Sequence, residues 1–226
     1  TVAENISTST AVYTAVATDV DAGTTLTYSL SGADAALFNI DPSTGVVTFK
    51  ASPNYESPAD AGGNNVYDIS VSASDGTNIT TQAVAITVTN VNEAPTFTSG
   101  ATATVAENIS TSTAVYTAVA TDVDAGTTLT YSLSGTDAAL FNIDPSTGAV
   151  TFKASPNYES PADAGGNNVY DISVSASDGT NITTQAVAIT VTNVNEAPTF
   201  TSGATATVVE NISTSTAVYT AVATDV

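Results

Sequence analysis

The stretch Thr89-Asn90-Val91-Asn92-Glu93-Ala94-Pro95-Thr96-Phe97 occurs a second time, letter for letter, from Thr192 to Phe200. Pro95 has no backbone N–H and a fixed φ, and it biases Ala94 toward extended geometry. Taken alone, the stretch is equally compatible with a turn that interrupts a strand, because Asn and Pro are common turn residues. Its position between two blocks of alternating apolar and polar residues favours a stiff linker between two all-β domains.

The linker belongs to a long internal repeat. Residues 1–103 and 104–206 differ at two positions only, Ala33/Thr136 and Val46/Ala149, and a third copy begins at Thr207. A unit of this length matches one independently folded domain and is too long for a solenoid repeat. We therefore expect one domain over residues 1–95, a second over 96–198, and the first two strands of a truncated third over 199–226.

Within each repeat the hydrophobic pattern has a period of two. Leu26, Tyr28 and Leu30 alternate with polar residues, and similar runs cover residues 67–73 and 84–88, with shorter ones over 12–16, 38–40 and 46–49. Such alternation predicts strands with one buried face. About seven short strands in roughly 100 residues indicate a Greek-key β-sandwich of immunoglobulin-like size. The inward phase of Tyr28, Phe38, Phe49 and Tyr67 predicts a core role for these aromatic residues, and residues 52–65 are expected to form a surface loop.

Composition excludes several classes of function. The chain has 22 acidic and two basic residues, a net charge of −20, no His and no Cys. This charge repels nucleic acid and anionic membrane surfaces. Without His or Cys there is no Ser–His or Cys–His nucleophile, so we expect no enzyme. No apolar run approaches the length of a membrane-spanning helix, so this segment is not expected to insert into a membrane.

The acidic residues are concentrated at strand ends. In a sandwich, Asp19, Asp21 and Asp75 should lie at one pole of the first repeat, and Glu56 and Glu93 at the other, with Glu4 able to join them. Two carboxylates about 4 Å apart repel by roughly 1 kcal/mol in water and about 4 kcal/mol at intermediate dielectric. Two lysines cannot neutralise such clusters, whereas Ca²⁺ accepts carboxylate, amide and backbone carbonyl oxygens. The alternative, a solvated acidic surface, is favoured for Asp34, Asp41 and Asp68, and an additional ion at Asp60 or Asp163 stays open.

The repeat resembles the cadherin repeat family in its bacterial cadherin-like form. The matching motifs are Val2-Ala3-Glu4-Asn5, Asp19-Val20-Asp21 (in the second repeat Asp122-Val123-Asp124), Asn54-Tyr55-Glu56, Ala73-Ser74-Asp75-Gly76 and Asn90-Val91-Asn92-Glu93-Ala94-Pro95. Each motif is weak alone, but five in order at the right spacing are specific. The resemblance covers the whole repeat.

The resemblance implies two or three Ca²⁺ ions at each joint between repeats. At the first joint the implied ligands are Glu4, Glu56, Asn90, Asn92, Glu93, Asp122, Asp124 and Asp178. At the second joint they are Glu107, Glu159, Asn193, Asn195, Glu196 and Asp225. Asp19, Asp21 and Asp75 hold the equivalent positions of the first repeat. Three departures from the family pattern, Asn54, Asn90 and Ala94, lead us to expect that the outermost ion, next to the loop, is the weakest.

The resemblance further implies an extracellular, cell-surface location, and near-identical repeats favour a structural spacer in a long calcium-rigidified adhesin. The alternative is that the repeats themselves adhere, to like repeats in trans or to glycans. A third possibility concerns residues 207–226, which hold too few strands to bury a core. Either their domain continues in the same chain, or they complete a neighbouring chain in a filament.

Overall fold

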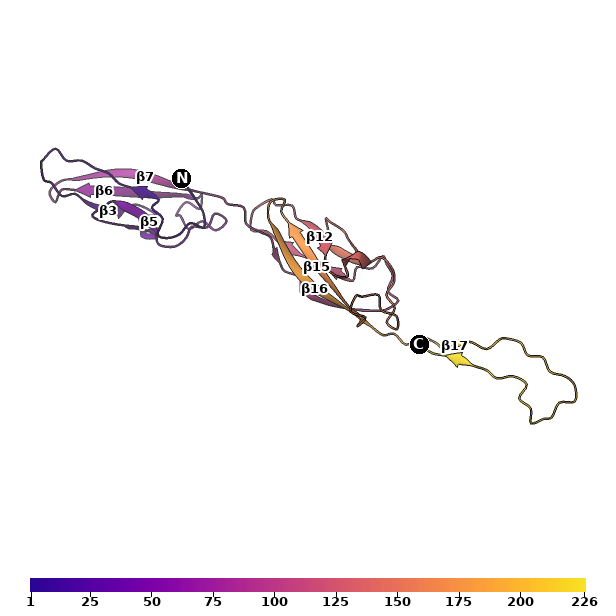
Figure 1. Ribbon diagram of the computed structural model, residues 1–226. Helices are drawn as coiled ribbons and strands as arrows, with labels where there is room; N and C mark the ends of the chain where they lie inside the picture. The colour runs from indigo at the N-terminus through magenta and orange to yellow at the C-terminus, as the bar shows by residue number, and fades with distance from the viewer. The chain divides into compact units, whose positions relative to one another are not determined.

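The computed structural model describes residues 1–226, and its contacts divide into two units: Thr1–Glu93 together with Val123–Gly126, and Ala94–Asp122 together with Thr127–Val226. The first unit contains seven strands, as the alternation of its sequence predicts (Figure 1). They are β1 (Val2–Ala3), β2 (Tyr13–Thr14), β3 (Thr27–Ser31), β4 (Phe38–Ile40), β5 (Val46–Phe49), β6 (Val66–Ser74) and β7 (Ile79–Thr89). A single 3-10 turn, η1 (Ala35–Leu37), precedes β4.

These strands form two sheets, one in the order β1-β7-β6-β3 and one in the order β2-β5-β4. All pairs are antiparallel except β1 with β7, which run parallel with Val2 opposite Val88. Two such sheets packed face to face make a Greek-key sandwich, so the prediction of all-β sandwich domains is confirmed.

The second repeat forms the same sandwich with additional strand pairing near its start. Its strands are β8 (Thr96–Phe97), β9 (Thr102–Ala106), β10 (Tyr116–Thr117), β11 (Ala120–Thr121), β12 (Thr130–Ser134), β13 (Phe141–Ile143), β14 (Ala149–Phe152), β15 (Val169–Ser177) and β16 (Ile182–Thr192), with the 3-10 turn η2 (Ala138–Leu140). Here the parallel pair β9–β16 extends over five residues, and β8 adds a short antiparallel pair with β11.

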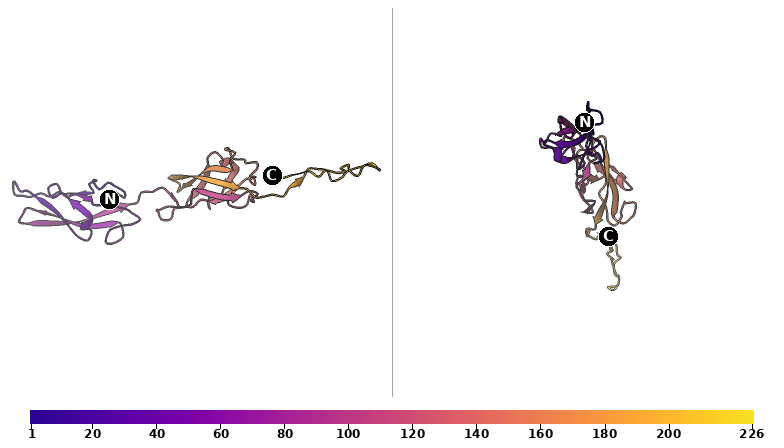
Figure 2. Two further views of the ribbon diagram at one scale, coloured as in Figure 1. Left: turned by 90° about the horizontal axis from the view of Figure 1, so that it is seen from below. Right: turned by 90° about the vertical axis from the view of Figure 1, so that its left-hand side faces the viewer.

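After the second repeat, β17 (Thr199–Phe200) pairs with β18 (Ala223–Thr224). Figure 2 shows this yellow segment as a ribbon on which no second sheet is packed, and Val208, Val209 and Phe200 are exposed accordingly. The whole chain contains no helix long and apolar enough to cross a membrane.

The core of each sandwich is built on three aromatic side chains, as their phase predicts. Phe38, Phe49 and Tyr67 are at most 3% exposed, and the ring centroids of the two phenylalanines lie 4.4 Å apart. Tyr67 meets both rings edge-on, a favourable geometry for aromatic pairs. Tyr28, predicted to be core, is only partly buried, and its hydroxyl accepts a hydrogen bond from the Ala17 N–H.

The expectation that Asp34 is a solvated surface acid is wrong. Asp34 is 3% exposed, and its two carboxylate oxygens accept hydrogen bonds of 2.7 Å from the backbone N–H groups of Ala61 and Asp68. Asp137 makes the equivalent contacts in the second repeat. A carboxylate with two such donors is stabilised in its charged form although it is buried. Asp34 thereby ties the loop between β5 and β6 to the start of β6, and this loop carries Glu56.

Candidate metal centre

Three glutamates converge at one end of the first sandwich. Because β1 runs parallel to β7, Glu4, directly after β1, lies beside the segment that follows β7, and its N–H donates to the Thr89 carbonyl at 3.0 Å. One carboxylate oxygen each from Glu4, Glu56 and Glu93 lies within 4.8 Å of the other two. The first strand, the long loop and the linker each supply one of these residues.

Glu4 organises this cluster. It is 2% exposed, and its two oxygens accept hydrogen bonds of 2.8 Å from the N–H groups of Tyr55 and Val91. Since Tyr55 precedes Glu56 and Val91 lies two residues before Glu93, one buried carboxylate positions both other acids. β1 ends at Ala3, so Glu4 is the first residue after this strand.

Three of the four carboxylate oxygens of the other two acids have no donor. Both carboxylate oxygens of Glu56, and Oε2 of Glu93, are buried with no hydrogen-bond partner. Burial raises the pKa of Glu56, and the charges of Glu4 and Asp124 raise it further. Burial likewise raises the pKa of Glu93, together with the charges of Glu4, Glu56 and Asp124. A group of carboxylates gathered without compensating donors requires protons or a cation.

Asp124 contacts this cluster, and Val123–Gly126 belongs to the first unit. It is 9% exposed; its Oδ1 accepts from Asn90 Nδ2 at 2.7 Å and its Oδ2 accepts from the Glu93 N–H at 2.9 Å. The linker amide of Asn90 is thus used as a donor in this structure. Asn92 donates from Nδ2 to the Glu93 carbonyl at 3.1 Å.

Sequence reasoning did not single out Asn5 as part of this cluster. Asn5 has φ of 59° and its Nδ2 donates to Glu93 Oε1 at 2.7 Å. Asn108, also in the left-handed region, makes the same contact with Glu196 at 2.8 Å. Asn tolerates the left-handed region better than most residues do, so an Asn directly after the strand-end Glu was the available signal.

The second sandwich repeats the cluster with Glu107, Glu159 and Glu196, again within 4.8 Å of one another. Glu107 accepts 2.8 Å hydrogen bonds from the N–H groups of Tyr158 and Val194, and these two donors lower its pKa. Glu159 is exposed here and accepts from Asn193 Nδ2 at 2.7 Å. Asn195 donates to the Glu196 carbonyl at 3.0 Å, and Asp225 lies near the C-terminus with Oδ1 accepting from the Val226 N–H.

The remaining predicted ligands lie at the ends of strands. Asp122 follows β11, and Asp178 follows β15, where its Oδ1 accepts from the N–H groups of Thr180 and Asn181. Their first-repeat equivalents, Asp19 and Asp75, line one cavity of about 140 Å³, which Asp21 does not line. Asp19 instead accepts from the Asp21 N–H at 2.9 Å. Backbone donation from Asn78 and Thr77 lowers the pKa of Asp75.

Asp60 has a local structural role. Its two oxygens accept 3.0 Å hydrogen bonds from the N–H groups of Asn64 and Asn65, and Asp163 does the same in the second repeat. These donors close a turn in the Gly/Asn-rich loop and occupy the oxygens that the possible additional ion would need.

The comparison with protein families settles what this architecture is. The model of the cadherin domain matches residues 1–92 and again residues 101–195. The chain belongs to the cadherin family. Cadherin repeats are non-enzymatic, extracellular adhesion domains that bind Ca²⁺ at the linkers between them, and both acidic clusters of this chain include a linker glutamate.

Named relatives are much longer than this cadherin segment. It is 35% identical to mouse protocadherin Fat 2 over 139 residues, which are 60% of the chain, and 32% identical to human protocadherin Fat 4 over 169 residues, which are 70% of the chain. The chain spans about 3% of the length of either relative. Among solved structures, mouse cadherin-23 EC22-24 matches with a TM-score of 0.63 and 23% identity, covering 99% of this chain and 73% of that one. This likeness shows the shared fold.

The donor set of the first cluster fits a hard cation. All the convergent groups are oxygens, and three carboxylate oxygens of Glu56 and Glu93 are buried without a donor. Oxygen-only coordination by flexible carboxylates and carbonyls is the preference of Ca²⁺. The amides of Asn90 and Asn193 donate from nitrogen to carboxylates in this structure, and their role as oxygen ligands stays a prediction.

Proposed function

We propose that this chain is a spacer segment of a long extracellular adhesin whose joints are stiffened by calcium. The repeats are near-identical, which suits a segment repeated for length. The proposed domains are residues 1–95, 96–198 and 199–226. A bacterial form of the family remains a prediction from the repeat pattern, and the relatives named above, from mouse and human, lend it no support.

The observation that carries the proposal is the pair of Glu56 oxygens, buried without a donor beside Glu4 and Glu93. In the proposed first joint, Glu4, Glu56 and Glu93 act with Asp122, Asp124 and Asp178 of the next repeat. Asn90 and Asn92 contribute an amide or backbone oxygen. Six carboxylates carry a charge of −6, which three Ca²⁺ would cancel, so we propose two or three ions per joint.

The second joint uses Glu107, Glu159, Asn193, Asn195, Glu196 and Asp225 in the same roles. Asp19, Asp21 and Asp75 are the first-repeat equivalents of Asp122, Asp124 and Asp178 and lie at the pole opposite the first joint. Extracellular calcium modules bind at roughly 10⁻⁴ to 10⁻³ M. At millimolar calcium, an ion of the tighter class stabilises the array by about 1.4 kcal/mol through mass action. Calcium thereby converts a loosely jointed chain into a stiff one.

The test is thermal unfolding of the chain in calcium and in EDTA, with small-angle scattering on both samples. We expect a higher melting temperature and a longer particle in calcium. Glu56→Gln should remove most of the calcium-induced rise, whereas Asp41→Asn, at an exposed turn acid outside the clusters, should leave it unchanged. If the melting temperature and the particle shape do not change when calcium is removed, the acidic residues are only surface charge and the proposal is wrong.

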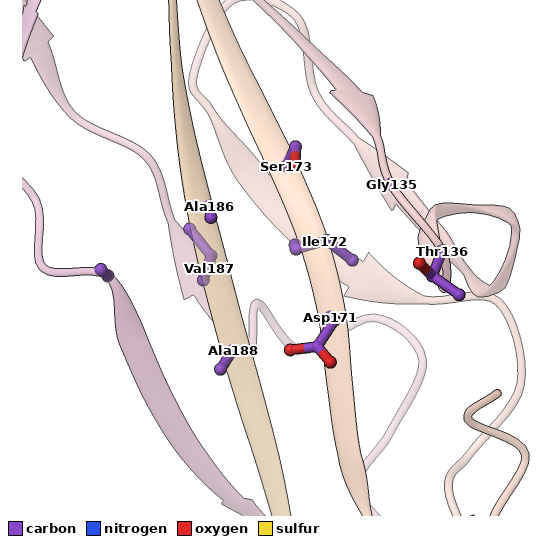
Figure 3. Close-up of a pocket in the computed structure, with 9 residues that line it drawn as sticks. Gly135, Thr136, Asp171, Ile172, Ser173, Ala186, Val187 and Ala188 are labelled. Carbon is purple, nitrogen blue, oxygen red and sulfur yellow. The ribbon is translucent and has the colours of Figure 1, made fainter. Parts of the chain in front are cut away.

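Adhesion by the repeats themselves is the second candidate, with like repeats in trans or a glycan as partner. A shallow hollow of about 320 Å³ lies on β15 and β16. It is lined by small side chains such as Ser173, Ala186 and Ala188, together with Asp171 (Figure 3). The first repeat has a similar hollow of about 370 Å³. Neither hollow presents an aromatic ring on which a sugar could stack, which favours the spacer.

A further inference from the structure

The backbone on either side of Tyr55, directly before Glu56, is held by two side chains. The Tyr55 N–H donates to the buried carboxylate of Glu4 at 2.8 Å, and the Tyr55 carbonyl accepts from Asn65 Nδ2 at 2.8 Å. Asn65 is not among the predicted ligands; it lies at the end of the same loop, directly before β6. Because the peptide between Tyr55 and Glu56 is planar, fixing the Tyr55 carbonyl also fixes the N–H of Glu56 and the start of its side chain.

Asn65 is itself locked in place by its backbone. Its N–H donates to Asp60 Oδ1 at 3.0 Å, and its carbonyl accepts from the Val88 N–H of β7 at 2.9 Å. Its φ is 62°, in the left-handed region that Asn tolerates better than most residues do. The loop and the sheet therefore anchor the backbone of Asn65, and its amide extends from this anchor to Tyr55.

Two features of Asn65 are unfavourable for folding. Its backbone is left-handed although it is not glycine, and its Oδ1 is buried without a hydrogen-bond partner in a side chain that is 9% exposed. A left-handed side-chain-bearing residue and an unsatisfied buried acceptor each cost stability. Such features are concentrated at functional sites, where the surrounding structure maintains them. Asn65 is thus a candidate for a role beyond folding.

The second repeat carries the same arrangement. Asn168 has φ of 61°, its N–H donates to Asp163 Oδ1 at 3.0 Å, and its carbonyl accepts from the Val191 N–H at 2.9 Å. Its Nδ2 donates to the Tyr158 carbonyl at 2.9 Å, and its Oδ1 is again buried without a partner. The contact is therefore a property of the repeat and not of one copy.

We propose that Asn65 and Asn168 are positioning residues of the calcium sites, which hold the peptides before Glu56 and Glu159 so that these carboxylates are ready to bind the ion. This inference rests on the calcium-dependent function proposed above. A glutamate on a loosely held loop has to be ordered when the ion binds, and this ordering weakens affinity. Asn65 reduces that cost because the peptide is ordered beforehand.

The contact made by Asn65 differs from the one made by Glu4. Glu4 is a predicted ligand, so its carboxylate has to serve both the ion and the Tyr55 N–H. The hydrogen bond from Asn65 to the Tyr55 carbonyl involves no predicted ligand, so it holds the peptide in the same way with and without calcium.

The test combines Asn65→Gly and Asn168→Gly in the full chain. Glycine adopts a φ near 60° without strain, so the variant loses the amide and keeps the backbone. Calcium titration calorimetry should show binding weakened about tenfold, the equivalent of one hydrogen bond. The melting temperature in EDTA should stay within a few degrees of that of the unaltered chain. In EDTA, the Tyr55 and Tyr158 N–H groups should exchange their hydrogen faster, a readout that needs no calcium.

A matched control changes the neighbouring residues, Asn64→Ala with Asn167→Ala. These exposed side chains accept 3.0 Å hydrogen bonds from the N–H groups of Val66 and Val169 and make no contact with either tyrosine carbonyl, so calcium affinity should be unchanged. Calcium affinity that survives in the glycine variant, or falls equally in the control, would overturn this inference alone. Absence of calcium binding by the unaltered chain would overturn the proposed function and this inference with it.

Discussion

The first and second repeats show how far two copies of one sequence can differ when their surroundings differ. Only Ala33/Thr136 and Val46/Ala149 distinguish them, yet Ala176 is fully buried where Ala73 is partly exposed, and the parallel edge pair covers five residues in the second repeat and two in the first. In the second repeat, β8 pairs with β11 and Phe97 packs against the core. The burial and hydrogen bonding of a side chain thus depend on the segments that pack against its sandwich, and not on the sequence of the repeat alone.

The largest effect on this comparison should come from Phe97→Ala. Removing a partly buried ring from the edge of the second core should cost about 2–3 kcal/mol and lower the unfolding temperature of that repeat toward that of the first. Calorimetry in EDTA, where the calcium sites do not contribute, measures the change. Phe200→Ala is the matched control, the same substitution in the same local sequence at an exposed site, and an equal effect of both variants would contradict the comparison.

A smaller effect should distinguish the two glutamines. Gln185→Ala removes two hydrogen bonds to the carbonyls of Ser99 and Gly100 and should destabilise the second repeat by about 1–2 kcal/mol. Gln82→Ala, on the uncovered surface, should change stability by less than about 0.5 kcal/mol. Urea titration of each variant provides the two values. Equal losses would show that coverage by residues 96–101 is not the cause.

The smallest expected effect is the pH dependence of the stability of each repeat in the absence of calcium. Glu56 and Glu93 have raised pKa values in the folded protein, so the folded state binds their protons more tightly than the unfolded state does, and the first repeat should lose stability as pH rises from about 4.5. Glu107 has a lowered pKa, so the second repeat should gain stability as pH rises toward about 4.5 and should keep that gain above it. In EDTA, the melting temperature of the first repeat should therefore fall relative to that of the second repeat as pH rises from about 4.5 to 7. Parallel melting curves of the two repeats would contradict this difference.

Much of the fold follows directly from the sequence because it depends on local patterns. Alternation located the long strands near Tyr28, Tyr67 and Ile86, and the inward phase identified Phe38 and Phe49 as core. The grouping of Glu4, Glu56 and Glu93 also followed, since strand order fixes which ends of a sandwich share a pole. Their action as calcium ligands stays a prediction.

Other features depend on contacts that no local pattern reveals. Asp34 is buried because N–H groups 27 and 34 residues away meet its carboxylate, so composition alone placed it wrongly on the surface. Asn5 reaches Glu93 only after the backbone of Asn5 adopts a left-handed turn.

The parallel pairing of the first and last strands has a mechanical consequence. Tension applied through the linkers pulls β9 from its beginning and β16 from its end, in opposite directions along the strands. The five paired positions of this ladder are then loaded together in shear, and extension requires all of them to yield at once.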